Sequence, residues 1–152
     1  MKEYTKRVIL LTFILLLTIM TVVIALRINS KRLNELNSTS NIKDYLTEIN
    51  YDDISNHVVE VPNIVIYVSN SSNQDSINFE KLFIKVIKKY NLENEIIYVN
   101  INNTNIIDPF YQDAPQLLFY KDSSISDIIV CSVLDSEKEI IKVLKERGII
   151  ND

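Results

Sequence analysis

The sequence predicts an α/β domain, with a central mixed sheet flanked by helices, behind one N-terminal transmembrane helix. Three observations lead to this fold class. Residues 8–26 contain no charged side chain. Behind them, short runs of β-branched and aromatic residues alternate with segments of helical periodicity. The last two of these runs are close enough in sequence to pair as an antiparallel hairpin, whereas the earlier crossovers favour parallel strands.

The uncharged segment, residues 8–26, is nineteen residues long. At about 1.5 Å of helical rise per residue it reaches roughly 28 Å, close to the hydrocarbon thickness of a bilayer. We expect an uncleaved anchor; the alternative is a cleaved signal peptide with Val23-Ile24-Ala25 as its small-residue site. Three basic residues lie on each side of the segment, and the N-terminal amine adds to the first set. We therefore expect a single-pass protein of the cell membrane, with the tail 1–7 inside and the domain outside.

Residues 27–43 are polar and predict a linker, into which the helix of the anchor can continue, and residues 44–152 form the predicted domain. The formal charge divides near this linker, with +5 over residues 1–32 and −9 over residues 33–152. Nucleic acid is therefore not an expected partner, because phosphate binding needs a basic face. The single Cys excludes a dithiol centre within the chain, and the single Gly excludes a glycine-rich phosphate loop. With only one His as well, we expect no metal site and no cofactor.

The first half of the domain is predicted to run strand, helix, strand. Residues 45–49 predict a short strand, and Asp52 is placed to cap the short helix that follows. Residues 63–68 are almost all β-branched or aromatic, which is typical of a strand buried on both faces. A polar loop, 69–75, comes next. The apolar residues expected on the short helix are Ile54, Val58 and Val59.

The clearest predicted helix is 76–90, because its apolar residues recur at spacings of three and one and its lysines lie on the opposite side. Residues 95–101 predict a second buried strand. Residues 102–113 are expected to be irregular, since Pro109 argues against a long helix there.

The end of the domain is predicted to be a hairpin and a closing helix. Residues 116–120 and 127–131 predict the two strands, and the turn residues 122–124 join them. The last helix is expected to begin at a capping box that starts with Ser136. It ends before Gly148, the only glycine of the chain.

This order of elements resembles the thioredoxin fold over residues 44–150. Residues 114–122 are similar to that family's small residue, cis-proline and apolar strand ending in lysine and a turn. The resemblance implies a cis bond between Ala114 and Pro115. An anchor followed by an acidic domain also resembles the membrane-tethered thioredoxin-like proteins of low-GC Gram-positive bacteria, including the bacteriocin-accessory type.

The active-site motif departs from the family's pattern. Where thioredoxins have Trp-Cys-Gly-Pro-Cys, this chain has Ser71-Ser72-Asn73-Gln74-Asp75. Both thiol positions, Ser72 and Asp75, carry oxygen side chains, and thiol–disulfide exchange requires a thiolate and a second sulfur. The family's buried acid falls on Ile66 and its neighbouring lysine on Tyr98. We therefore expect that the protein is not a dithiol oxidoreductase and not an enzyme.

The candidate site is the groove that family members use to pair with extended peptides through their backbone. Two simpler interpretations stay open at this point: Pro115 only shapes the turn into the hairpin, and the loop only supplies a helix cap from Asp75 or Ser76. The candidate peptide-binding residues are Ser71, Ser72, Ala114, Pro115 and Gln116.

The single Cys131 is the candidate thiol, because the resemblance places it beside the cis-proline and the active-site loop. Its neighbours are apolar, so the alternative is an unreactive, buried residue that acts as a small hydrophobe. His57 has no second ligand within reach in sequence and is expected on the surface or at a helix end.

These observations predict a membrane-tethered, redox-inactive thioredoxin-like module. Its expected role is that of an accessory protein that engages a protein or peptide at the cell envelope. The alternative is a thiol-disulfide protein that acts through Cys131 alone or with a partner that brings the dithiol.

Overall fold

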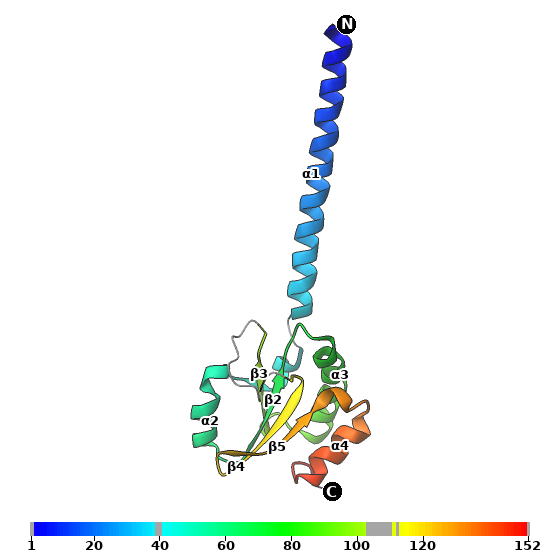
Figure 1. Cartoon of the computed structure of the whole chain (residues 1–152). Helices are drawn as coiled ribbons and strands as arrows, with labels where there is room; N and C mark the ends of the chain where they lie inside the picture. Colours follow the sequence, from blue (N-terminus) through cyan, green and yellow to red (C-terminus); the bar gives the residue numbers. More distant parts are fainter. Residues whose placement is uncertain (1, 39–40, 103–110, 112, 152) are drawn as a thin grey trace. The chain divides into compact units, whose positions relative to one another are not determined.

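A computed structural model describes residues 2–38, 41–102, 111 and 113–151 of the chain. It divides into two units, residues 1–37 and residues 38–152. The first unit is a helix, and the second is the α/β domain (Figure 1).

Helix α1 spans Lys2–Ser38. Its stretch Lys6–Arg27 reaches a mean hydropathy of 3.0, so it is long and apolar enough to cross a membrane, although a signal sequence has the same character. None of its apolar side chains is buried against protein, which distinguishes it from the core helix of a globular domain. The hydroxyl of Thr12 donates to the carbonyl of Val8 at 2.9 Å, and Thr18 and Thr21 bond back in the same way. These polar groups are thus satisfied inside the helix.

The polar segment that was expected to be a linker is helical as far as Ser38. Residues 27–38 contain neither Gly nor Pro and include several good helix formers, so nothing in their sequence ends the helix. A short 3₁₀ turn, Asn41–Asp44, begins the domain. Its Ile42 is fully buried and forms part of the main core.

The domain contains one five-stranded mixed sheet with the order β1-β3-β2-β4-β5. Strand β2 pairs in parallel with β3 and antiparallel with β4, while β1 and β5 form the edges of the sheet. Ile66 marks the register, because it lies opposite Ile97 on β3 and Leu118 on β4. The strands are β1 (Thr47–Glu48), β2 (Ile64–Ser69), β3 (Ile96–Asn100), β4 (Gln116–Lys121) and β5 (Ser124–Val130).

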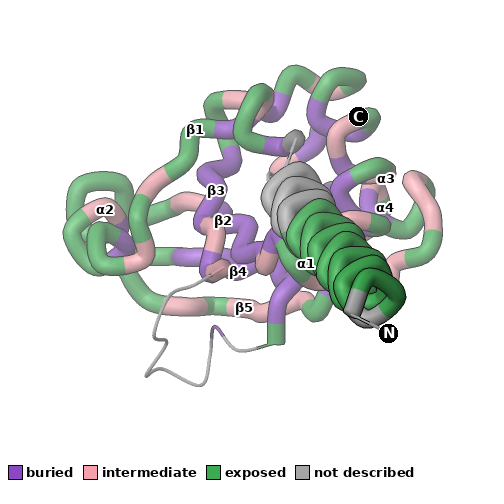
Figure 2. The backbone as a smooth tube through the Cα atoms, turned by 90° about the horizontal axis from the view of Figure 1, so that it is seen from above, coloured by how far each residue is buried: buried purple, intermediate pink, exposed green. Residues whose placement is uncertain are grey.

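Helices cover both faces of the sheet, and the central strands are the most buried part of the domain (Figures 1 and 2). Helix α2 (Ile54–Glu60) packs on one face, and α3 (Gln74–Tyr90) and α4 (Glu137–Glu146) pack on the other. Tyr67 on β2 faces α3 and α4, whereas its neighbour Ile66 faces α2. This alternation along an almost wholly apolar strand is what burial on two faces produces.

The predicted fold class and the order of elements are therefore confirmed. The hairpin is longer than predicted, because β5 begins at Ser124 and the turn narrows to Asp122 and Ser123, both with positive φ. Residue 131 is not in the strand; it begins a 3₁₀ turn, Cys131–Val133. Most of the predicted irregular stretch 102–113 lies outside the described residues.

The start of α2 differs from the prediction. Asp52 lies in a 3₁₀ turn, Tyr51–Asp53, and the helix begins at Ile54 without a side-chain cap. The Asp53 carboxylate instead accepts a bond from the side-chain amide of Asn50 at 3.2 Å. Val59 is 73% exposed and does not belong to the core, because α2 contacts the sheet with only one narrow face.

The last helix follows the prediction at both ends. The hydroxyl of Ser136 accepts the backbone N–H of Glu139, and the Glu139 carboxylate accepts the N–H of Asp135 at 2.9 Å. Gly148 has a φ of +71°, the left-handed conformation that commonly ends a helix.

We expect Phe83→Ala to lower the free energy of unfolding by about 3–5 kcal/mol, because Phe83 is fully buried against Tyr67 and Phe79. Val59→Ala, at an exposed position, is the control and should change it by less than about 0.5 kcal/mol. Urea unfolding of the full chain in detergent, followed by near-ultraviolet circular dichroism, measures both values. Equal effects of the two substitutions would contradict the core assignment.

Candidate functional site

Three segments meet at one end of the sheet to form the candidate site. They are the loop between β2 and α3, the turn before β4 and the turn after β5. The side-chain amide of Asn73 donates to the carbonyl of Ala114 at 3.1 Å, and the backbone N–H of Cys131 donates to the carbonyl of Pro115 at 2.7 Å. The loop at Asn73, the Ala114–Pro115 turn and Cys131, which the resemblance assigns to one site, are thus neighbours in space.

The loop is held by polar bonds at the positions where thioredoxins have their motif. The carbonyl oxygen of the Asn100 side chain accepts the N–H of Ser71 at 3.3 Å, and the Asn100 amide donates to the Ser71 hydroxyl at 3.1 Å. The Ser72 hydroxyl donates to the Asn102 side chain at 2.8 Å. Ser71 is 1% exposed, whereas Ser72 and Asp75 are on the surface. Ser71 therefore supports the loop, and only the other two can meet a ligand directly.

Asn73 is the N-cap of α3, so the predicted caps, Asp75 and Ser76, are wrong. Its side-chain oxygen accepts the N–H of Asp75 at 2.9 Å, and the helix begins at Gln74, two residues earlier than predicted. The reason is that an Asn in extended conformation reaches the first free N–H groups of the helix as well as Ser or Asp does. Ser76 is buried, and its hydroxyl accepts the N–H of Asn70 at 3.2 Å.

The Ala114–Pro115 peptide bond is cis, as the resemblance implied. Pro115 is buried, and Ala114 is 9% exposed. Gln116 is 1% exposed, and β4 is paired on both sides, opposite Val68 of β2 and Val130 of β5. Ala114, Pro115 and Gln116 are therefore all shielded from solvent, and the Gln116 side chain cannot meet a peptide directly.

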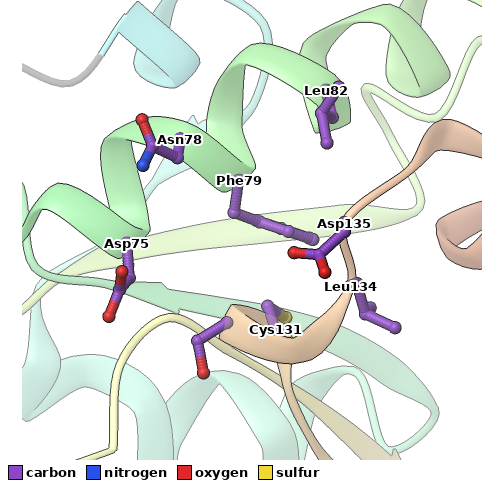
Figure 3. Close-up of a pocket in the computed structure, with 8 residues that line it drawn as sticks. Asp75, Asn78, Phe79, Leu82, Cys131, Leu134 and Asp135 are labelled. Carbon is purple, nitrogen blue, oxygen red and sulfur yellow. The ribbon is translucent and has the colours of Figure 1, made fainter.

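Cys131 lines a cleft of about 210 Å³ between α3 and the turn after β5 (Figure 3). The thiol lies 3.5 Å from the carbonyl oxygen of Ile129, and the residue is 1% exposed. Burial raises the pKa of the Cys131 thiol far above its usual range. This burial favours the unreactive interpretation, because the thiolate is the reactive form. The other lining residues are Asp75, Asn78, Phe79, Leu82, Ser132, Leu134 and Asp135.

Glu80 is the buried polar residue that our sequence analysis missed. It lies on α3 with 5% of its surface exposed, and its carboxylate accepts bonds from Ser69 at 2.6 Å and from Tyr67 at 3.3 Å. Burial, and next the Glu80 carboxylate, raise the pKa of Tyr67 well above its usual value. The helical spacing contained the signal, since residue 80 lies three and seven positions before the core residues Phe83 and Ile87.

The positions of the family's buried acid and lysine are both part of the apolar core. Ile66 is fully buried on the α2 face, and Tyr98 stacks on Tyr67 with ring centroids 5.9 Å apart. His57 is half-buried on α2, where its backbone carbonyl accepts the N–H of Val61 at 2.8 Å. Within the described part of the chain, no group of three or more His, Cys, Asp and Glu side chains could hold a metal ion.

The comparisons with known proteins support the fold and nothing finer. No family model matches the chain, and no curated protein is significantly similar to it. Among solved structures, it is similar to thioredoxin f2 from Chlamydomonas reinhardtii, with 11% sequence identity and a TM-score of 0.52. The match covers 70% of this chain and 99% of that one. The domain thus has a thioredoxin-like fold, and its described residues hold a single cysteine.

We expect maleimide to label Cys131 at least about 100-fold more slowly in the native chain than in urea, because a buried thiol reacts only when the structure opens. The ratio of the rate in urea to the native rate should stay nearly constant between pH 7 and pH 9, because in both conditions the thiol reacts only in an exposed form. Mass spectrometry of timed samples measures both rates. Fast native labelling that rises with pH would identify Cys131 as a reactive site.

Proposed function

We propose that this protein is a membrane-tethered, redox-inactive thioredoxin-like module that binds a protein or peptide at the cell envelope. The observation that carries the proposal is that Ser72 and Asp75 stand at the two thiol positions of the motif within a thioredoxin-like framework. The framework includes the cis bond before Pro115 and the loop beside it. The proposal includes an accessory role like that of bacteriocin-accessory proteins, which an anchor followed by an acidic domain resembles.

Redox chemistry is the weaker candidate for physical reasons. Exchange needs a thiolate to attack and a second thiol to resolve the mixed disulfide. Ser72 and Asp75 supply neither, and Cys131 is buried with its pKa raised. A role for Cys131, alone or with a dithiol partner, would need the cleft to open first.

The binding surface that we propose is the rim around Ala114. Asp113 is exposed next to it, and Val130 and Val133 on the other side of the cis-proline are 39% and 70% exposed. Exposed apolar side chains beside this turn suit a peptide that makes small apolar contacts and pairs with the backbone by main-chain bonds. The partner is accordingly a protein segment in extended conformation.

The tether supports a location at the envelope. The stretch Lys6–Arg27 can cross a bilayer, and basic residues flank it on both sides. We propose that the tail 1–7 is cytoplasmic and the domain extracytoplasmic, so that the domain meets partners in or near the same membrane.

Photo-crosslinking in cells tests the binding surface. Gln116 is buried and unsuitable, so benzoylphenylalanine is placed at the exposed Asp113, and Lys145 on α4 is the control position. We expect a discrete crosslinked product from position 113 and none from 145. Crosslinks from 145 alone would place the interface elsewhere and contradict the proposal.

Restoring the thiols with Ser72→Cys and Asp75→Cys tests the redox half of the proposal. The native chain should not reduce insulin with dithiothreitol, and any turnover by it would overturn the proposal. The double variant should form a disulfide under mild oxidation, because its two thiols lie at the start of α3 with the family's spacing. Its insulin reduction should stay about 100-fold below that of a thioredoxin, because Ile66 offers no general acid or base.

Two other outcomes would change the interpretation. If the two cysteines fail to bridge, the loop is not equivalent to the thioredoxin loop. If the double variant reduces insulin as fast as a thioredoxin, the missing thiols alone account for the inactivity of the native chain, and Ile66 does not limit the rate.

A further inference from the structure

The side chain of Asn73 joins the loop to the turn before β4 through two hydrogen bonds. Its oxygen accepts the N–H of Asp75 at 2.9 Å, and its amide nitrogen donates to the carbonyl of Ala114 at 3.1 Å. We call the second of these bonds the Asn73 bridge. The first bond caps α3 and would exist without the second, so the bridge is not needed to begin the helix.

The carbonyls beside the cis bond are both engaged within the chain. Ala114 accepts the Asn73 bridge, and Pro115 accepts the N–H of Cys131 at 2.7 Å. Proline itself has no N–H to offer. A peptide that adds to this turn as a strand must donate an N–H to a backbone carbonyl, and the Asn73 amide already takes one of the two acceptor positions of the Ala114 carbonyl.

The two bonds differ in how easily they can be exchanged. The Cys131 bond extends the ladder between β4 and β5 and comes from a residue that is 1% exposed. Asn73 is only half-buried, and its amide belongs to a side chain that can rotate. Exchanging one neutral hydrogen bond for another costs little, so an incoming N–H can replace the Asn73 amide at Ala114.

We propose that the Asn73 bridge keeps the peptide-binding groove closed, and that a bound peptide replaces it at the Ala114 carbonyl. Asn73 is thus a gate residue that lowers the affinity for any peptide that pairs with the Ala114 carbonyl. This inference rests on the proposed function, because it assigns the regulation of the same groove.

Two substitutions separate the Asn73 bridge from the cap. Asn73→Ser keeps an oxygen that caps α3 but is too short and lacks the amide that donates to Ala114. Asn73→Ala removes both. If the bridge closes the groove, both variants open it; if Asn73 matters only as a cap, Asn73→Ser behaves like the parent.

The rate at which a thiol beside the groove captures a peptide disulfide measures the opening of the groove. The parent carries Ser72→Cys, and the probe is the peptide Ac-Thr-Val-Cys-Val-Thr-amide with its cysteine as the 2-thiopyridyl disulfide. The thiolate at position 72 attacks the peptide sulfur, forms the new S–S bond and releases 2-thiopyridone, which is followed by absorbance. The rate is divided by the rate with 2,2′-dithiodipyridine, and the chain without Ser72→Cys gives the background from Cys131.

We expect this ratio to rise about 3- to 10-fold in both Asn73 variants, the range that loss of one neutral hydrogen bond allows. An unchanged ratio in Asn73→Ser overturns the inference. It leaves the proposed function standing if the parent already reacts faster with the peptide than with the small disulfide. A rise in Asn73→Ala alone also overturns it, because it would reflect loss of the cap. A ratio near one in all variants contradicts the peptide groove itself.

Discussion

Strand β2 is hydrogen-bonded to β3 on one side and to β4 on the other, and helices cover both of its faces. Its alternate side chains serve two separate parts of the core, with Tyr67 against α3 and α4 and Ile66 against α2. A shift of one residue in its register would exchange these sets and leave both faces mispacked. The loop that follows β2 is therefore held in one position, next to the turn before β4.

This positioning explains how the loop keeps its place without a cysteine. In the described loop, side-chain amides and hydroxyls provide the connections. Asn100 binds Ser71, Asn102 binds Ser72, and Asn73 binds Ala114. Each bond is weak by itself, but each joins the loop to an element that β2 already orients. Polar side chains thus hold the described loop in place, and its residues 69–75 contain no cysteine.

Glu80 places a buried carboxylate in the core under the loop, with 5% of its surface exposed. Burying a carboxylate is unfavourable unless hydrogen bonds compensate it. Ser69 and Tyr67 donate those bonds, and both belong to β2. Glu80 therefore connects α3 to the end of the same strand that carries the loop.

The sequence by itself determined the elements and their order. The alternation of β-branched runs and helical spacing, the capping box at Ser136 and the motif at 71–75 are local signals, and each led to the correct region of the fold. Helix ends were less certain: Asn73, Asp75 and Ser76 are all good caps, and only packing selects among them.

Only the tertiary structure decided which side chains are available. Residue 116 is a polar glutamine, but β4 lies inside the sheet, so it is buried. Glu80 and Cys131 are likewise buried by contacts between elements far apart in sequence. The Asn73 bridge spans 41 residues of chain and has no local signal. Burial and such distant bonds depend on how the elements pack, and the periodicity of a single element does not contain that information.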